Sequence, residues 1–430
     1  MINFYLKTLG CAKNSVDSEA IEKMLTKSGF GEVFSPLEAD VIIVNTCGFI
    51  ESAKEENIEA ILDLIKYDAK IVVTGCLVER YYNELKEAIP EVDLWVRFKD
   101  EYTLLARYIE KLFNDSIKVH DFDIFDREAN VSDGVLYLKI SEGCDNFCAF
   151  CAIPYIRGRF ESYDSDKLVE YVKNTAKVQH FNEICIIGQD PTSYGKDLKN
   201  GDNLLVLLKK LVKLEEAKHI RLLYLYPRGI SDELIEFIKN EEKIIKYFDI
   251  PIQHISQNIL KGMNRRDDST TTKKVLYKIK KEIPEAIFRT TFIVGFPGET
   301  NRDFLKLLNF VKTFEFNHLG AFTYSREEGT RAFNLPHQVR EYTKVKRKDI
   351  LLNAQKTISY KKNKELIGKT FDAYVISESN GKYEVRFAWN SPDGIDGNAY
   401  LKCDKKLNPG DEIKIKVTHA FVYDLYVELA

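Results

Sequence analysis

Short apolar strands alternate with helical stretches through most of this chain, and no other feature constrains its fold as much. In the first quarter, three segments rich in β-branched and aromatic residues are each followed by a stretch with helical periodicity. These segments are residues 3–9, 40–45 and 70–74. Because parallel strands need long crossover connections, usually helical, this order predicts a parallel sheet with helices packed on it.

The same alternation continues in the middle of the chain. Six further strand candidates are residues 135–140, 183–187, 220–226, 247–252, 287–294 and 319–324. Helical stretches separate them, among them 203–214, 232–239 and 300–314, and a long charged helical stretch follows at 338–366. Six strand–helix repeats predict a partial (β/α)6 barrel, with its site at the carboxyl ends of the strands.

Towards its end the chain changes from helical periodicity to strict alternation. Ile413, Ile415 and Val417 alternate with polar residues, as in a strand with one buried face, and Asn380-Gly381 is a hairpin-turn signal. These patterns predict a small antiparallel β-barrel of the OB type. We therefore expect an α/β chain with an N-terminal parallel-sheet domain at 1–118, an acidic linker at 119–132, a barrel core at 133–365 and the terminal β-barrel at 366–430.

Composition disfavours several classes of protein. The 430 residues carry a net charge of −3, whereas a protein that grips nucleic acid through its phosphates usually has a basic surplus. No apolar run approaches the roughly 18 residues of a membrane span, and the N-terminus has no signal-peptide pattern. We expect a cytoplasmic protein with no membrane partner, whose eight cysteines are thiols or metal ligands rather than disulfides.

Three of the cysteines, Cys144, Cys148 and Cys151, have the spacing C-x3-C-x2-C in a loop that follows a strand candidate. Three thiolates so close together can hold one face of a [4Fe–4S] cluster and leave the fourth iron free for a cofactor or substrate. A zinc site usually takes four ligands, and no fourth Cys or His lies nearby in the sequence. Three inert buried thiols at this spacing would be a coincidence.

Three other cysteines, Cys11, Cys47 and Cys76, each lie just beyond the end of one N-terminal strand candidate. The carboxyl ends of parallel strands share one edge of a sheet, so these thiols are expected to converge there. A metal or cluster site is one interpretation, and buried thiols or a redox pair are the alternatives. Cys185, in the middle of a strand candidate, and Cys403, in a polar turn region, are interpreted as structural.

The spacing of Cys144, Cys148 and Cys151 is the signature of the radical S-adenosylmethionine (SAM) superfamily, which the chain resembles. The resemblance implies that the free iron chelates the amino and carboxylate groups of SAM, and that one electron cleaves SAM to a 5′-deoxyadenosyl radical. It also implies that Phe150 lies near the adenine and that the Gly188-Gln189 edge meets the methionine amino group, although the family pattern there is Gly-Gly-Glu. Gly295, Pro297 and Gly298 resemble another turn that faces the cofactor; a plain strand–helix turn is the alternative.

Residues 9–11 with Asn14 and 17–19, residues 45–50 and residues 74–76 resemble the N-terminal domain of the methylthiotransferase family. In that family the terminal β-barrel is the TRAM domain, so the resemblance covers essentially the whole chain. It implies a second [4Fe–4S] cluster on Cys11, Cys47 and Cys76, which carries a sulfur species for insertion. It also implies an electron donor that the sequence does not specify, and no acid–base catalytic side chain. One departure is Ala12, where a proline is common.

The family has two substrate branches. Residues 47–54, 142–146, 152–158, 249–255 and 395–397 resemble the branch that modifies an aspartate of the twelfth protein of the small ribosomal subunit. The resemblance implies that a methylthio group is inserted at the aspartate β-carbon; the alternative is a tRNA adenosine methylthiotransferase. From Leu366 to Ala430 eight Lys and Arg face ten Asp and Glu, a difference of −2. An RNA-binding barrel should be basic, so no direct tRNA substrate is expected, although a near-neutral surface is also typical of any solvated barrel.

A cluster-binding electron carrier is an interpretation from a different functional class. It would bind iron and sulfide without cleaving SAM. A carrier needs neither a six-strand barrel nor an extra β-domain, so the domain organisation favours the enzyme.

Overall fold

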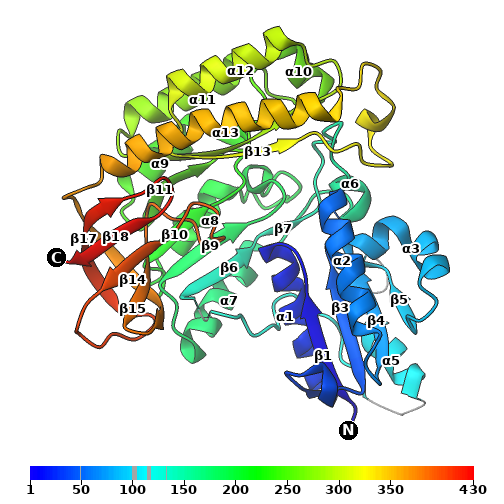
Figure 1. Cartoon of the computed structure of the whole chain (residues 1–430). Helices are drawn as coiled ribbons and strands as arrows, with labels where there is room; N and C mark the ends of the chain where they lie inside the picture. The colour runs from blue at the N-terminus through cyan, green and yellow to red at the C-terminus, as the bar shows by residue number, and fades with distance from the viewer. Residues whose placement is uncertain (49, 99–103, 114–117, 132) are drawn as a thin grey trace.

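The computed structural model describes residues 1–48, 50–98, 104–113, 118–131 and 133–430. Phe49, in the expected motif after Cys47, and residue 132, at the end of the expected linker, lie outside these ranges. Within them the chain forms three parts: an N-terminal α/β part, a central α/β part and a C-terminal barrel (Figure 1). No helix in these ranges is both long and apolar enough to span a lipid bilayer.

The N-terminal part is built on a parallel five-stranded sheet in the order β2-β1-β3-β4-β5. Its strands are β1 (Asn3–Thr8), β2 (Gly31–Glu32), β3 (Val41–Thr46), β4 (Lys70–Gly75) and β5 (Leu94–Val96). Its helices are α1 (Ala12–Lys27), α2 (Glu51–Leu64), α3 (Cys76–Ala88) and α5 (Leu105–Phe113). A 3-10 turn, η1, spans Pro36–Glu38. The three strands expected from the sequence are present, and the very short β2 and β5 are additional.

The central strand of this sheet, β3, is buried on both sides because helices cover both faces. Val41 and Ile43 of β3 pack in one cluster with α1 and α5, whereas Ile42 and Val44 pack in another with α2 and α3. Successive side chains of a strand point to opposite faces, so a continuous apolar run such as this one is typical of a sheet between two helical layers.

The central part is an open sheet of six parallel strands in the order β13-β12-β11-β10-β9-β6. Its strands are β6 (Val135–Lys139), β9 (Glu183–Ile187), β10 (His219–Leu222), β11 (Ile244–Asp249), β12 (Ile287–Val294) and β13 (His318–Thr323). Neighbours in space are also successive long strands of the chain, so the sheet is the partial barrel expected from the alternation. Strand β10 ends at Leu222, before the expected Tyr226, because Tyr224 has a left-handed backbone (φ 62°) that a strand cannot continue through.

Helices cover the outer face of the open barrel (Figure 1). They are α7 (Ser165–Val178), α8 (Leu204–Leu211), α9 (Asp232–Asn240), α10 (Gln257–Gly262), α11 (Ser269–Glu282) and α12 (Asn301–Phe314). The long helix α13 (Glu341–Lys364) packs along β13 and α12. Shorter elements are β7 (Ser141–Glu142), α6 (Ile153–Ile156), β8 (Glu161–Ser162), η3 (Pro191–Ser193), η4 (Pro227–Gly229) and η5 (Arg331–Asn334).

The C-terminal part is a closed five-stranded barrel in the order β14-β15-β16-β18-β17. Its strands are β14 (Thr370–Ser379), β15 (Lys382–Phe387), β16 (Ala399–Lys402), β17 (Glu412–Ala420) and β18 (Leu425–Leu429). Asn380 and Gly381 form the expected two-residue turn between β14 and β15, both with positive φ (54° and 72°). Strands β16 and β18 pair in parallel and so close the barrel.

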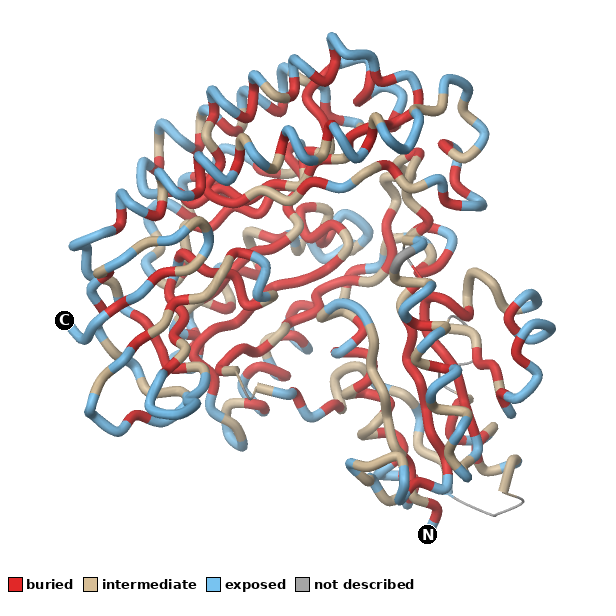
Figure 2. The backbone as a smooth tube through the Cα atoms, viewed as in Figure 1, coloured by how far each residue is buried: buried red, intermediate tan, exposed pale blue. Residues whose placement is uncertain are grey.

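The terminal barrel packs on the inner face of the open central sheet, beside the first halves of its strands. Val135 and Ile287, the first residues of β6 and β12, share one apolar cluster with the barrel interior. Arg289 of β12 donates to both carboxylate oxygens of Asp393 of the barrel, at 2.8 and 2.5 Å. Figure 2 shows the strands of the N-terminal and central sheets as mostly buried, and the outer faces of the helices as exposed. The carboxyl ends of the central strands are thereby left for the site.

Candidate functional site

One loop between β7 and α6 presents Cys144, Cys148 and Cys151. Its shape is held by main-chain bonds: the Cys151 N–H donates to the Cys148 carbonyl at 3.0 Å, and the Cys144 N–H donates to the Gly158 carbonyl at 3.3 Å. Phe147, between the first two cysteines, has a left-handed backbone (φ 47°). A non-glycine residue with such a backbone is a local strain that the surrounding structure must hold in place, and such strain clusters at functional sites.

The other triad is assembled from three strand ends. Strands β1, β3 and β4 are adjacent in the sheet, with Thr8 beside Asn45 and Thr46 beside Gly75, so the residues that follow them meet at one edge. Cys11 caps α1 and Cys76 begins α3, which places both thiols at helix N-termini. The positive end of a helix dipole favours an anionic group there.

Polar side chains fix the three loops of this triad. The Asn14 amide donates to the carbonyls of Leu9 and Thr46, at 3.0 and 2.9 Å, and so ties the first loop to the second. Asn57 accepts a hydrogen bond from the Cys47 N–H at 2.8 Å, and the Thr46 hydroxyl donates to the Thr74 carbonyl at 2.6 Å, just before Cys76. The three cysteines are therefore held by contacts between segments far apart in the sequence.

Both triads open into one cavity of about 490 Å³. Its walls come from the N-terminal part, the cysteine loop and the carboxyl ends of β9, β10 and β11. The structure thus brings together all six cysteines singled out in the sequence, which are Cys11, Cys47, Cys76, Cys144, Cys148 and Cys151.

The thiols of this cavity differ in how readily they ionise. Burial raises the pKa of Cys76 to about 11, although Arg157 opposes the shift, and burial likewise raises the pKa of Cys144 to about 11. Desolvation also acts on Cys11, but Lys13, the Asn14 N–H group and Arg157 outweigh it and lower the pKa of that thiol. Because a metal ligand must be a thiolate, metal binding here is coupled to proton release.

Three half-buried side chains line the cavity and carry buried polar atoms with no partner among the described residues: Gln189 (Oε1), Gln253 (Oε1) and Arg265 (Nε). Such atoms are costly to bury unless a ligand or water satisfies them. Gln253 also has a left-handed backbone (φ 70°). The cavity therefore combines thiols with unsatisfied donors and acceptors, which fits an iron–sulfur group together with a polar cofactor.

In the part of the chain that the structure describes, no three His, Cys, Asp or Glu side chains lie close enough to hold a single metal ion. Ligands of one zinc ion would each lie about 2.3 Å from it and so crowd together. Two sets of three cysteines spread around one cavity fit a wider multinuclear group better than a lone ion.

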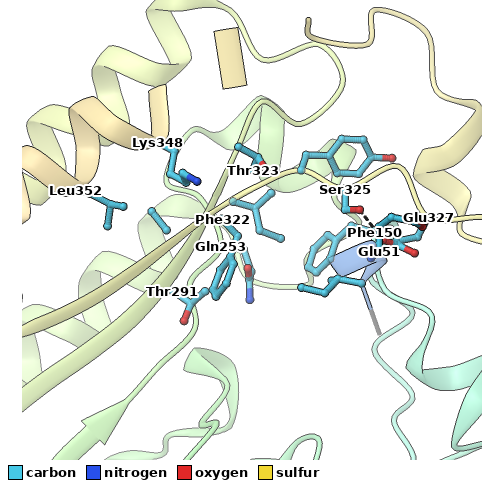
Figure 3. Close-up of a pocket in the computed structure, with 14 residues that line it drawn as sticks. Glu51, Phe150, Gln253, Thr291, Phe322, Thr323, Ser325, Glu327, Lys348 and Leu352 are labelled. Atoms are coloured by element: carbon cyan, nitrogen blue, oxygen red, sulfur yellow. Dashed lines mark hydrogen bonds between the residues drawn. The ribbon is translucent and has the colours of Figure 1, made fainter. Parts of the chain in front are cut away.

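A second cavity, of about 620 Å³, adjoins the first (Figure 3). Phe150, Gln253 and Phe322 line both cavities. In Figure 3, Lys348 and Leu352 of α13 lie at one end of the second cavity, and Ser325 and Glu327 lie at the other. The wall between the two cavities is mostly apolar, as is typical of a site for a largely hydrophobic ligand with few polar anchors.

The other site residues expected from the sequence divide into two groups. Gly188 and Gln189 line the cysteine cavity, where the Gln189 amide donates to Glu142 at 2.8 Å. Gly295 packs against Lys344 of α13: a Cβ added to it would lie 2.3 Å from the Lys344 Cγ. Among the described residues, those that line either cavity do not include Gly295, Pro297 or Gly298.

Sequence reasoning did not single out Arg157, Tyr224, Gln253 or Arg265, although all four line the cysteine cavity. Arg157 and Gln253 lie within stretches quoted for the family resemblance, which was the only signal for them. Nothing in the local sequence marks the strained backbone of Tyr224 or Gln253, because strain is a product of the completed fold.

Two family models match the chain. Residues 3–97 match a family described as "Uncharacterized protein family UPF0004", and residues 138–311 match the radical SAM superfamily. Solved structures share the fold. TsrM, a radical SAM methyltransferase from Kitasatospora setae solved with cobalamin and a [4Fe–4S] cluster, has a TM-score of 0.57 at 11% identity and covers 89% of this chain and 77% of its own. OxsB, a cobalamin-dependent SAM radical enzyme, has a TM-score of 0.53 at 14% identity, with 83% and 56% covered.

Curated relatives match along the whole chain. A protein of Clostridium botulinum is 43% identical over 99% of this chain and 97% of its own length. A protein of Aquifex aeolicus is 42% identical over 97% and 95%, and one of Caldanaerobacter subterraneus subsp. tengcongensis is 42% identical over 100% of both. Each of the three is named ribosomal protein uS12 methylthiotransferase RimO.

Proposed function

The chain belongs to the RimO family of ribosomal protein uS12 methylthiotransferases, and on that premise we propose that it performs this reaction with two [4Fe–4S] clusters that face one cavity. The substrate is ribosomal protein uS12, and the methylthio group enters at the β-carbon of an aspartate. The observation that carries the proposal is the cavity itself, which all six cysteines line. Two groups that must act on one carbon atom need to reach the same enclosed space.

Cys144, Cys148 and Cys151 would hold the cluster that binds SAM. Together, cluster and SAM supply one-electron chemistry that can remove a hydrogen atom from a carbon that no ordinary base can deprotonate. The unpaired Gln189 oxygen at the end of β9 suits the methionine amino group of the cofactor. Gly188, beside it, has no side chain and leaves that edge open.

The adenosine half of SAM would lie towards the second cavity. Phe150, on the wall shared by the two cavities, offers an aromatic face, and Ile293 adds an apolar surface. The unpaired Gln253 oxygen between the cavities can accept a hydrogen bond from a sugar hydroxyl. Gly295, Pro297 and Gly298 would support this cavity indirectly, through the packing of Gly295 against α13.

Cys11, Cys47 and Cys76 would hold the second cluster, with the sulfur species that is transferred. The helix N-termini at Cys11 and Cys76 and the Lys13 ammonium place positive charge on this wall of the cavity, and Arg157 adds a donor whose charge is partly neutralised by Asp17. An anionic sulfur species is stabilised by such surroundings.

The junction between the N-terminal part and the core closes one side of the site. Arg80 of α3 and Glu327, which follows β13, form a buried ion pair at 3.0 Å, and Glu327 also accepts from the Glu51 N–H at 3.0 Å. Arg80 donates to the Gly48 carbonyl at 2.8 Å as well. These contacts keep the Cys47 and Cys76 loops against the core.

The experiment is a competition between substrates. The protein is reconstituted anaerobically with iron and sulfide, given SAM and a reductant, and offered uS12 and tRNA together. Mass spectrometry is expected to find a methylthio group in place of hydrogen on an aspartate of uS12. Modification of tRNA alone would overturn the substrate assignment, and deoxyadenosine without any modified product would leave only the SAM chemistry standing.

A further inference from the structure

The Arg157 side chain links the segment after the Cys144–Cys151 loop to the thiol of Cys76. The residue follows α6, directly after the Cys144–Cys151 loop, and its side chain is 2% exposed. Its Nε–H donates to the Cys76 sulfur at 3.2 Å, and one terminal amino group donates to Asn14. The Phe98 ring lies 4.1 Å from its guanidinium carbon. A planar guanidinium with several fixed donors can make these contacts at once, which a lysine cannot.

Two carboxylates hold Arg157 in this orientation. Asp17 of α1 accepts from it at 2.5 Å, and Glu142 accepts from it at 3.3 Å. Lys139 of β6 also pairs with Asp17, at 2.6 Å, and with Glu142. The four charges balance, and none of them is well exposed, so changing one of them alters the field at Cys76 with little screening by solvent.

We propose that Arg157 is a positioning residue that raises the reduction potential of the cluster on Cys11, Cys47 and Cys76, and that Asp17 sets the size of this effect. The inference rests on the function proposed above. Reduction adds an electron and makes the cluster more negative. A hydrogen bond to the ligand sulfur and a nearby positive charge both stabilise that more negative state. Asp17 lowers the positive field because it neutralises part of the guanidinium charge.

Arg265 provides the internal comparison. It stands near the other triad, with a terminal amino group 3.7 Å from the Cys148 sulfur and its guanidinium over the Tyr226 ring at 3.9 Å. Its other terminal amino group donates to the Pro251 carbonyl at 2.9 Å. No ion pair links Arg265 to a carboxylate among the described residues, so its contact with sulfur is both longer and less firmly oriented.

The test isolates the cluster on Cys11, Cys47 and Cys76. Cys144, Cys148 and Cys151 are replaced by alanine in the full chain, and the midpoint potential of the remaining cluster is measured by redox titration monitored by electron paramagnetic resonance. Arg157→Gln should move the potential to a more negative value, and Arg157→Lys should give a smaller shift in the same direction. Asp17→Asn should move it to a more positive value. Arg265→Gln is the matched control and should give a smaller negative shift than Arg157→Gln, because this guanidinium lies by Cys148, whereas that of Arg157 donates to the Cys76 sulfur.

Opposite shifts for Arg157→Gln and Asp17→Asn distinguish electrostatic tuning from a loss of structure, which would not reverse sign. Absence of iron in the background protein would refute the proposed cluster on Cys11, Cys47 and Cys76 itself. An assembled cluster whose potential does not move, or moves in one direction for both variants, would overturn the role of Arg157 and leave the cluster assignment intact. If Arg157→Gln fails to hold iron, Arg157→Lys and Asp17→Asn still decide the question by the signs of their shifts.

Discussion

The two cysteine triads reach the same cavity by different routes. Cys144, Cys148 and Cys151 lie on one loop, whereas Cys11, Cys47 and Cys76 follow three strands of a sheet. The triad on one loop needs only a correctly shaped loop. The triad at the three strand ends needs the register of β1, β3 and β4, and the docking of the whole N-terminal part on the core. A local site should therefore tolerate loosening of the fold that a site assembled from distant segments does not.

The largest expected effect comes from removing one ligand of each triad. Cys148→Ala should reduce SAM cleavage to background, because the cofactor loses its iron anchor. Cys47→Ala should retain SAM cleavage and lose methylthiolation. Deoxyadenosine and modified uS12 are quantified in the same reaction. If Cys47→Ala still methylthiolates uS12, the division of labour between the triads is wrong.

Breaking the buried Arg80–Glu327 pair is the next largest change. Glu327→Gln leaves Arg80 without its counter-charge, at a cost of about 3–5 kcal/mol to the docking of the N-terminal part. Hydrogen exchange should rise in α2 and α3 and stay low in the loop that carries Cys144, Cys148 and Cys151. Glu328→Gln, at the exposed neighbouring position, is the control. Equal loss of protection at both triads would remove the proposed difference between them.

Acid should weaken the buried ion pairs of Glu142 with Lys139 and Arg157, which lie between the two triads. Burial favours the neutral form of Glu142, but Lys139 and Arg157 outweigh it and lower the pKa of Glu142 to about 2. A carboxylate with a lowered pKa stabilises the fold above its unfolded value near 4.5, and this contribution is lost as the pH falls towards 2. Between pH 6 and pH 3 the loss is about 2 kcal/mol, measured by urea unfolding of the iron-free protein at these two pH values. Glu142→Gln should show a smaller pH dependence, and an unchanged one would contradict this account.

A smaller effect is expected at Gly75, which directly precedes Cys76. Its φ is 99°, and an added Cβ would lie 2.5 Å from the Thr46 carbonyl oxygen, a backbone atom that cannot move aside. Gly75→Ala should lower the free energy of unfolding by about 1–3 kcal/mol, and it should lower the iron content of the Cys11, Cys47 and Cys76 triad alone. Gly29, with φ 90° and nothing within 4 Å of an added Cβ, is the matched control. Equal iron loss in Gly29→Ala would show that backbone strain, rather than crowding at the strand end, is responsible.

The smallest effect is expected at Cys403, which lies outside both triads and whose thiol is near the Lys405 carbonyl at 3.4 Å. Cys403→Ala should change the free energy of unfolding by less than about 0.5 kcal/mol. Iron and sulfide per chain should stay the same. A lower iron content would mean that this cysteine takes part in cluster assembly.

The same contrast explains what the sequence could predict. Alternating apolar residues marked the long strands, and the spacing of Cys144, Cys148 and Cys151 marked a local site, because both signals lie within a few neighbouring residues. The ion pair between Asp17 and Arg157 joins residues 140 positions apart and has no local signal. The early end of β10 at Leu222 follows from the backbone of Tyr224, whose N–H is held by Asp249 at 2.9 Å across to β11. Such features depend on contacts that exist only once the chain has folded.

Helix α13 constrains how this chain can evolve. Near its start Lys344 packs against Gly295, and near its end Asn363 donates to the carbonyls of Phe421 and Val422 in the terminal barrel. Inserting or deleting one residue between these positions would turn one end relative to the other by about 100° and shift it by about 1.5 Å. Substitutions on the exposed face of α13 leave the relative rotation and spacing of its two ends unchanged. Selection can therefore vary the exposed face of the helix freely while its length and its buried face stay fixed.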